Sequence, residues 1–404
     1  MKILIPFSYY HPEQCAGLFV IDDMTAEAAK QGIESLITVP TPTRNVDPGA
    51  KWNRDEVMCD GMVKVHRFWM YGEGKNPVLR ALRYLFCEIA QLHYMLWKKY
   101  DVAFIDSTPP IQGLKLPIVR LLRNKSVVYN AQDLFPETLK GAGLAKSNGF
   151  LWKIGLWVSK ITFRNSDKII AISEDIKRGI VERGIPEEKI EVVYNWVDAE
   201  TIIPVRKEEN SLYEEFGIAR DAFTIIYAGN LGNAQNINII LGAAYVLPDV
   251  QFAIFGTGGM EDEIRSRIES DGLTNVRLLP LQPYSRVSEV YSLGDACIVS
   301  CKAGLGGSAM PSKTWSIMAC GRPVIASFDE GELKDILEKN DCGVFSHAEN
   351  GPEFVAAIRY LKDNPTRCAE MGEKARQFIL ENLTKEVGTK KYVDVIKSVC
   401  STDR

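Results

Sequence analysis

Residues 296–327 read ACIVSCKAGLGGSAMPSKTWSIMACGRPVIAS, and this stretch decides the fold. Two apolar runs with strand character, 296–300 and 323–326, flank a loop of small residues and a helical segment at 312–320. Continuous apolar strands that alternate with helices are typical of parallel sheets covered on both faces. The stretch therefore predicts one strand–helix–strand unit of such a sheet.

The loop inside this stretch also predicts a ligand. Small residues from Gly304 onward let backbone N–H groups approach an anion closely. A helix that opens at Pro311, Ser312 and Lys313 directs its positive end and a lysine at the same point. We expect a phosphate or diphosphate here.

The same alternation runs through the whole chain of 404 residues, which is too long for one core. Strand patterns are expected at 3–7, 35–39, 63–68, 102–106, 126–130, 168–172, 191–194, 223–228, 250–255, 276–279, 296–300, 323–326 and 343–345. Helices of the second half are expected near 236–246, 260–270, 285–293, 312–320 and 331–339. The polar stretch 199–210 is the best linker. We expect an α/β protein with two doubly wound Rossmann-like domains, 1–200 and 201–384, that face a central cleft.

Composition excludes several classes of protein. Hydrophobic content of 46% and charged content of 25% exclude disorder, and no apolar run reaches the roughly 18 residues of a membrane span. The start shows no signal-peptide pattern, so we expect a cytoplasmic protein. Nine cysteines form no C-x-x-C pair, and the four histidines are not spaced as helix ligands. We expect no metal site and no cofactor.

Positive charge is concentrated in residues 51–164, where 18 Lys and Arg stand against 9 Asp and Glu, a net charge of +9. Such a patch attracts anionic lipid, an anionic acceptor or nucleic acid. Residues 151–164 place Leu151, Ile154, Val158 and Ile161 on one helical stripe and Lys153, Trp157, Lys160 and Arg164 on another.

The pattern 79–99 similarly predicts that Leu82, Phe86, Ile89 and His93 point inward while Arg80, Arg83, Tyr84, Tyr94 and Lys98 face out. Basic and aromatic residues on an exposed face suit a membrane surface. The alternative is a solvated helix face that covers the first-domain sheet.

Loops after three predicted strands contain candidate ligand groups. Gly17 in the loop 8–17 can allow close approach to a phosphate, although a plain turn is the alternative. The loop 228–237 offers backbone and carboxamide groups for a sugar or phosphate ester, from Gly229, Asn230, Leu231, Gln235 and Asn236. Its alternative is a turn that caps the next helix.

The segment 255–260 adds Gly256, but its G-x-G-G spacing and the acidic helix start that follows argue against a nicotinamide site.

Six segments together resemble the retaining glycosyltransferases of family 4, which have the GT-B architecture. They are DKIIAISE at 167–174, IEVVYNWVD at 190–198, YAGNL at 227–231, FGTG at 255–258, VRLLPLQP at 276–283, and PSK at 311–313 with MACGRP at 318–323. The segment DLFPE at 133–137 and PSK look most like the branch of capsule, O-antigen and exopolysaccharide transferases that includes fucosamine transferases.

This sequence departs from the family at four charged positions. Ser308 and Ser316 stand where the family has two glutamates, and Asn230 and Gln235 stand where an arginine and a lysine often bind the donor diphosphate. Lys313 is then the cation expected to stabilise the departing diphosphate, with backbone N–H groups of residues 304–309.

The resemblance also implies residues of the first domain and of the base site. It implies that Asp133 contacts sugar hydroxyls or the acceptor, although Asp133 is also placed to cap the next helix. Backbone groups around Gln282 would meet the base, which in the family is uracil. The last segment, 385–404, would return as a helix to the first domain.

We therefore expect a metal-independent retaining transferase in bacterial surface polysaccharide synthesis. It is expected to move a sugar from a UDP-sugar to a lipid-linked or oligosaccharide acceptor. An N-acetylated or 6-deoxy amino sugar is one expectation for the group moved. The expected catalytic residues are Lys313, Asp133 and Asn230. The expected substrate-binding residues are Gly17, Gly229, Leu231, Gln235, Asn236, Gly256, Gln282, Ser308, Pro311, Ser312 and Ser316. A nucleic-acid partner is not expected. A non-catalytic nucleotide-sugar-binding relative and a sugar-nucleotide epimerase remain alternatives.

Overall fold

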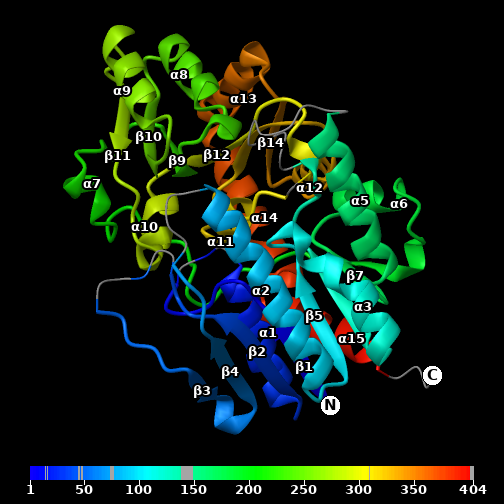
Figure 1. The fold of residues 1–404 in the computed structure, drawn as a ribbon. Coiled ribbons are helices and arrows are strands. Elements are labelled where there is room, and N and C mark those ends of the chain that lie inside the picture. Colours follow the sequence, from blue (N-terminus) through cyan, green and yellow to red (C-terminus); the bar gives the residue numbers. More distant parts are fainter. Residues whose placement is uncertain are drawn as a thin grey trace. The chain divides into compact units, whose positions relative to one another are not determined.

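Two sheets organise the chain in the computed structural model, which describes residues 1–13, 15, 17–43, 46, 49–72, 77–137, 149–308 and 310–400 (Figure 1). The first unit contains the described residues of 1–194 and the segment from Gly388, and the second contains residues 195–387. Each unit is an α/β structure with its own sheet. The expected fold class is confirmed.

The first unit has an eight-stranded sheet in the order β3-β4-β2-β1-β5-β6-β7-β8. Its strands are β1 Lys2–Pro6, β2 Glu34–Pro40, β3 Asp55–Met58, β4 Val63–Phe68, β5 Val102–Asp106, β6 Ser126–Ala131, β7 Lys168–Ala171 and β8 Ile190–Val192. All neighbours pair in parallel except β3 and β4, which are antiparallel. The sequence did not predict β3, because this short edge strand is largely exposed and carries no apolar run.

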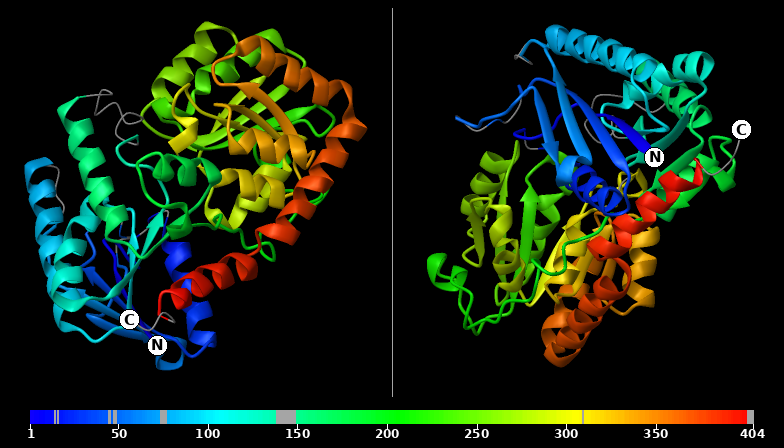
Figure 2. Two further views of the ribbon diagram at one scale, coloured as in Figure 1. Left: turned by 90° about the vertical axis from the view of Figure 1, so that its right-hand side faces the viewer. Right: turned by 90° about the horizontal axis from the view of Figure 1, so that it is seen from below.

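Helices cover both faces of this sheet. They are α1 Leu18–Lys30, α2 Pro77–Trp97, α3 Leu116–Arg123, α5 Phe150–Arg164, α6 Glu174–Val181 and α15 Lys385–Ser398, with the 3₁₀ turns η1 Cys59–Gly61, η2 Pro110–Lys115 and η3 Glu187–Lys189. The right-hand view of Figure 2 shows α1 and α15 on one face and α2 on the other. The Tyr392 hydroxyl of α15 donates to Asn130 Oδ1 at 3.0 Å, which ties this helix to β6.

The second unit has a parallel six-stranded sheet in the order β11-β10-β9-β12-β13-β14. Its strands are β9 Thr224–Asn230, β10 Gln251–Thr257, β11 Val276–Leu279, β12 Ala296–Ser300, β13 Val324–Phe328 and β14 Gly343–His347. The helices are α7 Leu212–Glu215, α8 Ile237–Val246, α9 Glu261–Ser270, α10 Val287–Ser292, α11 Lys313–Ala319, α12 Glu332–Lys339, α13 Gly351–Asp363 and α14 Pro365–Asn382, with η4 Asn233–Gln235, η5 Tyr284–Arg286 and η6 Gly306–Ser308. The predicted strands and helices of this half agree with the structure to within a few residues.

One arginine fixes the start of the second unit. Arg376 on α14 donates from Nη1 to the carbonyl oxygens of Ile202 and Ala319, both at 2.8 Å, and from Nη2 to that of Ala199 at 2.8 Å. A guanidinium suits this task because its five N–H groups form a rigid fork. The polar stretch after residue 198 is therefore held against α11 and α14.

The side that helix α2 buries differs from the sequence prediction, although Arg80 and Lys98 are exposed as expected. Leu82, Phe86, Ile89 and His93 were expected inside but are exposed, and Arg83 was expected outside but is 1% exposed. The buried face also carries Cys87, Glu88, Gln91 and Met95. The prediction was wrong because the polar residues find specific partners inside, described below.

Helix α5 differs from the expectation in a similar way. Leu151 and Ile154 of its apolar stripe are exposed, as are Lys153, Trp157, Lys160 and Arg164. The side that packs inward consists of smaller and aromatic residues, namely Gly155, Val158, Ser159, Thr162 and Phe163. A Cβ on Gly155 would lie 2.5 Å from Pro136, so close packing selects this side.

All nine cysteines are free thiols, and six of them are buried. Burial raises the pKa of Cys87, Cys301, Cys320, Cys342 and Cys368 to about 12. Within the described ranges, no helix is both long and apolar enough to cross a bilayer. The described residues also contain no group of three metal-ligating side chains.

Candidate functional site

Glycine backbone forms the carboxyl end of β9 in the second unit. Gly229 has a φ of 145°, a conformation that side chains other than hydrogen rarely allow. The Tyr227 hydroxyl donates to the Asn230 carbonyl at 2.8 Å and fixes the turn that follows. Leu231, which is fully buried, anchors the loop to the core.

The carboxyl end of the neighbouring strand, β10, also lies close to this turn. Gly256 of β10 pairs with Gly229 in the sheet register, and a Cβ on Gly256 would lie 2.4 Å from the Gly229 carbonyl oxygen. A Cβ on Gly258 would lie 2.6 Å from the Leu231 backbone. These contacts leave no room for a methyl group. The predicted strand-end loops therefore come together through their backbones.

Lys313 reaches the same place from the first residue of α11. Its Nζ lies 4.2 Å from the centre of the Tyr227 ring, and a Cβ on Gly229 would lie 2.9 Å from that nitrogen. Among the described residues, no carboxylate lies within ion-pair distance of Lys313. Burial lowers the pKa of Lys313 to about 8. The lysine is still mostly protonated at neutral pH, so the site presents an uncompensated positive charge.

The carboxamide loop after β9 completes this group. Asn230 Nδ2 lies 3.5 Å from Gln235 Oε1, and the Ser300 hydroxyl donates to the Gln235 carbonyl at 2.6 Å. Asn236 is left-handed, with a φ of 49°, and its side chain makes no capping bond to α8. The alternative interpretation, in which this loop caps the next helix through a side chain, therefore finds no support at Asn236.

The glycine-rich loop before α11 differs from its predicted role. The N–H groups of Gly304 and Gly306 donate to the two carboxylate oxygens of Asp329, at 3.0 and 2.8 Å. Two of the donors expected to face an anion are thus already bonded. Residue 309 and the Ser308 side chain lie outside the described residues. Pro311 and Ser312 precede α11, and Ser316 lies partly buried on that helix.

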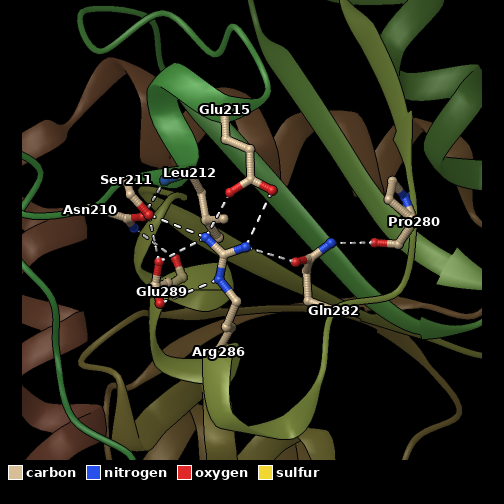
Figure 3. Close-up of polar contacts among 8 residues, drawn as sticks. All are labelled: Asn210, Ser211, Leu212, Glu215, Pro280, Gln282, Arg286 and Glu289. Atoms are coloured by element: carbon tan, nitrogen blue, oxygen red, sulfur yellow. Dashed lines mark hydrogen bonds and ion pairs between the residues drawn. The ribbon is translucent and has the colours of Figure 1, made fainter.

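Gln282 is held by an arginine that the sequence reasoning missed. Arg286 Nη1 donates to Gln282 Oε1 at 3.2 Å, and Gln282 Nε2 donates to the Pro280 carbonyl at 3.1 Å (Figure 3). The same guanidinium pairs with Glu215 at 2.8 Å and with Glu289 at 3.2 Å. Figure 3 shows these side chains converging on Arg286 from α7 and α10. Arg286 therefore connects the loop after β11, through Gln282, to Glu215 on α7 and Glu289 on α10.

A second group of polar side chains lies at the carboxyl ends of β5 and β6 in the first unit. Asp106 accepts hydrogen bonds from Asn130 Nδ2 at 2.9 Å and from the Thr108 backbone N–H at 3.1 Å. Burial raises the pKa of Asp106 to about 6, and the nearby charge of Asp133 contributes to this rise. Asp106 was not among the predicted site residues.

Asp133 itself follows β6, and burial raises the pKa of its carboxyl group. The segment after it is anchored by Arg183, which donates to the Phe135 carbonyl at 2.7 Å and to both oxygens of Glu137 at 2.6 Å. The helix that follows Asp133 begins at Glu137, and its continuation from residue 138 lies outside the described part of the chain. Gly17 immediately precedes α1 with a φ of −87°, so its backbone does not require glycine.

The structure thus forms two groups, one in each unit. The second unit brings together Gly229, Asn230, Leu231, Gln235, Gly256 and Lys313. The first unit brings Asp133 close to Asp106. Asp106, Arg286 and Asp329 escaped prediction because each has a partner more than 20 residues away in the sequence, namely Asn130 for Asp106, Glu215 for Arg286, and Gly304 and Gly306 for Asp329. Only their position at or just after the end of a strand, or beside Gln282, hinted at a role.

Open parallel sheets covered by helices bind ligands at the carboxyl ends of their strands, and Lys313 lies at this edge of the second sheet. The comparisons identify the class: residues 19–201 match the family described as Glycosyltransferase Family 4, and residues 209–378 match the family described as Glycosyl transferases group 1. The chain is a GT-B glycosyltransferase. More particularly, its N-terminal half is a family 4 glycosyltransferase domain and its C-terminal half is a group 1 glycosyl transferase domain.

Curated relatives agree with this class. The chain is 25% identical to the putative colanic acid biosynthesis glycosyl transferase WcaI of Escherichia coli K12, over 98% of this chain and 100% of WcaI. It is 21% identical to the probable glycosyltransferase WbjE of Pseudomonas aeruginosa, over 76% of this chain and 77% of WbjE. The chain is thus similar to transferases of polysaccharide and glycoconjugate biosynthesis.

Solved structures share the fold. Sucrose-phosphate synthase from Thermosynechococcus elongatus superposes with a TM-score of 0.81 at 15% identity, over the full length of both chains. Alr3699/HepE from Anabaena, crystallised with UDP, superposes with a TM-score of 0.74 at 16% identity, over 98% of this chain and 100% of that one. These likenesses concern the fold alone.

Proposed function

We propose that this protein is a retaining, metal-independent transferase that moves a sugar from a UDP-sugar to a lipid-linked or oligosaccharide acceptor. The sugar is proposed to be an N-acetylated or 6-deoxy amino sugar, and the product a bacterial surface polysaccharide such as a capsule or O-antigen. A lipid-linked acceptor places this reaction at the cytoplasmic side of the cell membrane. The observation that carries the proposal is the uncompensated Lys313 beside the glycine backbone of β9 and β10.

Lys313 supports a role at the leaving group. In a retaining transfer the bond between the sugar and the diphosphate oxygen breaks, and the acceptor oxygen bonds the same carbon on the same face. The acceptor proton passes to the departing diphosphate oxygen. Negative charge grows on the diphosphate, and a positioned cation in a partly dry site stabilises it most where water is excluded.

The other residues have supporting roles in this proposal. Gly229, Leu231 and Gly256 let the donor approach the backbone, and the side chains of Asn230, Gln235 and Asn236 offer neutral hydrogen-bonding groups to the diphosphate or sugar. Ser308, Pro311, Ser312 and Ser316 are proposed to bind the phosphates. Backbone groups at Gln282 meet the uracil.

Asp133 is proposed to contact sugar hydroxyls or the acceptor. Gly17 is proposed to allow a phosphate to approach the backbone closely. UDP is favoured as the donor nucleotide because the structurally similar Alr3699/HepE was crystallised with UDP and with UDP-glucose. The domain boundaries in this proposal are those expected from the sequence, with residues 385–404 joining the acceptor domain.

Release of nucleoside diphosphate tests the proposal. The full chain is incubated with a panel of nucleotide-sugars and a lipid-diphosphate-linked sugar acceptor, with and without chelator, and the anomeric configuration of the product is read by NMR. Acceptor-dependent release that survives chelation and gives a retained linkage is expected. Lys313→Ala should lose most of this activity.

A matched control uses Lys339→Ala, since Lys339 is an exposed lysine of the same unit whose Nζ pairs with Asp335 at 3.0 Å. The control should leave release unchanged. Donor binding with no release under any pairing would favour the non-catalytic relative, and interconversion of the donor sugar without an acceptor would favour the epimerase.

A further inference from the structure

Helix α2 is held with its polar side inward by specific bonds. Lys115 Nζ donates to Glu88 Oε2 at 2.6 Å and to Gln91 Oε1 at 2.7 Å, all of them buried. Gln91 Nε2 donates to the Phe7 carbonyl at 2.9 Å. Breaking a buried ion pair is strongly unfavourable, so these bonds fix the rotation of the helix about its axis.

Arg83 adds a second attachment on the same side. Its Nε donates to the Tyr71 carbonyl at 3.0 Å, and its Nη2 donates to Thr43 Oγ1 at 2.8 Å. With Arg83, Glu88 and Gln91 all bonded inside, the opposite side of this 21-residue helix, which carries Leu82, Phe86 and Ile89, has to face out. The exposure of the apolar side is therefore built into the fold.

The outward side of α2 carries large apolar side chains along its whole length. They are Val78, Leu79, Leu82, Leu85, Phe86 and Ile89, each 41–65% exposed. Trp97 follows near the last turn and is 74% exposed. Scattered exposed hydrophobic residues are normal, but a continuous stripe of this size marks an interaction surface.

The apolar surface continues on the two neighbouring helices. Helix α3 contacts both α2 and α5, so the three lie side by side in that order (Figure 1). Exposed apolar residues on α3 and α5 are Ile118, Leu121, Leu122, Leu151, Ile154 and Trp157. We call the solvent-exposed side of α2, α3 and α5 the outer face.

The charges on the outer face are all positive. Exposed basic residues on α2 and α5 are Arg80, Lys153, Lys160 and Arg164, and Lys98 and Lys99 follow the end of α2. The three helices contain a single acidic residue, Glu88, and it is buried against Lys115. Long basic side chains among exposed Trp, Phe and Leu residues match a surface that is apolar beneath and negatively charged above.

We propose that the outer face docks on the surface of a lipid bilayer that contains anionic phospholipid. The apolar side chains enter the boundary of the acyl chains, and the basic side chains meet the phosphates. A second copy of this chain fits less well, because a two-fold contact through the same face would bring like charges together. The inference rests on the proposed function only for the identity of the membrane.

Vesicle co-sedimentation of the full chain, without donor or acceptor, tests the proposal. Binding is expected to vesicles of phosphatidylglycerol and phosphatidylcholine and to be much weaker with phosphatidylcholine alone. Lys153→Gln, Lys160→Gln and Arg164→Gln together should lower the partition coefficient about a hundredfold, since each basic residue near an anionic surface contributes about fivefold. Leu82→Gln, Phe86→Gln and Ile89→Gln together should reduce binding to both vesicle types.

The matched control changes exposed aromatic residues of the second unit, Tyr245→Gln with Tyr360→Gln, and should bind like the unaltered chain. Circular dichroism and thermal melting check that each variant is folded, which is expected because every changed side chain is exposed. In addition, brominated lipid should quench the tryptophan fluorescence of the unaltered chain. The fraction quenched should be smaller in the double variant Trp97→Phe with Trp157→Phe.

Three results would overturn the proposal. The first is no binding of the unaltered chain to anionic vesicles. The second is equal binding by the outer-face variants and the control variant. The third is a concentration-dependent oligomer in ultracentrifugation that dissociates with the apolar variant while vesicle binding is absent, which would assign the face to a second copy. Because no transfer is measured, none of these results bears on the proposed reaction.

Discussion

At the ends of β9 and β10 the second unit places glycine backbone and one lysine, whereas at the ends of β5 and β6 the first unit places hydrogen-bonded polar side chains. The first arrangement tolerates no added atoms, since a Cβ on Gly256 would meet a carbonyl oxygen at 2.4 Å. The second depends on protonation, since Asp106 has a pKa of about 6. Two sheets of the same type can thus carry sites that respond to different changes, one to volume and the other to pH.

The largest expected effect concerns Lys313 at the strand ends of the second unit. Lys313→Ala should lower the rate of sugar transfer roughly 10²–10³-fold, because it removes the charge that stabilises the departing diphosphate. The melting temperature should not fall, since the lysine has no carboxylate partner among the described residues and burial of its charge already disfavours the folded state. Steady-state kinetics with thermal melting measures both, and Lys339→Ala in the same unit is the control. An active Lys313→Ala enzyme would refute the assignment.

The sensitivity of the second unit to added side-chain volume is tested at Gly256. Gly256→Ala should destabilise the second unit by about 3 kcal/mol, because the methyl group has to displace the Gly229 backbone or Leu231. Gly259→Ala is the matched control, because a Cβ there meets nothing within 4 Å. Chemical denaturation compares the two variants. Equal stability would mean that the glycine contact is not tight.

Protonation is tested at Asp106. Its folded-state pKa of about 6 lies above the ordinary value of 3.8, so the folded state binds the proton more tightly and this stability is lost as pH rises from about 4 to 6. The difference in unfolding free energy between the unaltered chain and Asp106→Asn should therefore fall by about 2–3 kcal/mol over that interval. Denaturation at several pH values measures it, and a difference independent of pH would contradict the prediction.

At Lys313 the dependence of folding stability on pH has the opposite sign. Its folded-state pKa of about 8 lies below the ordinary 10.5, so the unfolded state holds the proton longer and stability rises between these values. Affinity for UDP should fall as the lysine loses its proton above about pH 8, by up to tenfold per pH unit. Calorimetric titration from pH 7 to 9.5 tests this, with Lys313→Gln expected to show a flatter profile.

The smallest expected effect concerns Arg286, which holds the loop at Gln282 in the second unit. Arg286→Lys keeps the charge but loses the fork that reaches Glu215, Glu289 and Gln282 together. Because Glu215 is partly exposed, stability should fall by only about 1 kcal/mol. The Michaelis constant for the donor should rise if the loop at Gln282 holds the base. An unchanged constant would separate this loop from donor binding.

Strand-end loops were predictable because their signal is local. Apolar strands followed at once by Gly229 or Gly256 can be recognised from adjacent residues, and parallel strands place their ends at one edge. Lys313 was predictable because PSK follows a glycine-rich loop. Asp106 and Arg286 were not, since their bonds to Asn130 and Glu215 join residues 24 and 71 positions apart.

The sequence could not predict the rotation of α2 about its axis, and the physical reason is a different one. Apolar periodicity shows that a helix has two faces, but it does not say which face meets the core when polar residues have buried partners. The decisive partner, Lys115, lies 27 residues beyond Glu88. The edge strand β3 was missed because its sequence, DEVM, lacks the apolar run of a buried strand.

The bonds from Asp329 to Gly304 and Gly306 have a thermodynamic consequence for any ligand of this loop. A glycine-rich segment is costly to order, because its residues lose more conformational freedom than others. Here Asp329 orders the segment when the second unit folds. A ligand then meets a preorganised loop, and the entropy of ordering it does not weaken the binding.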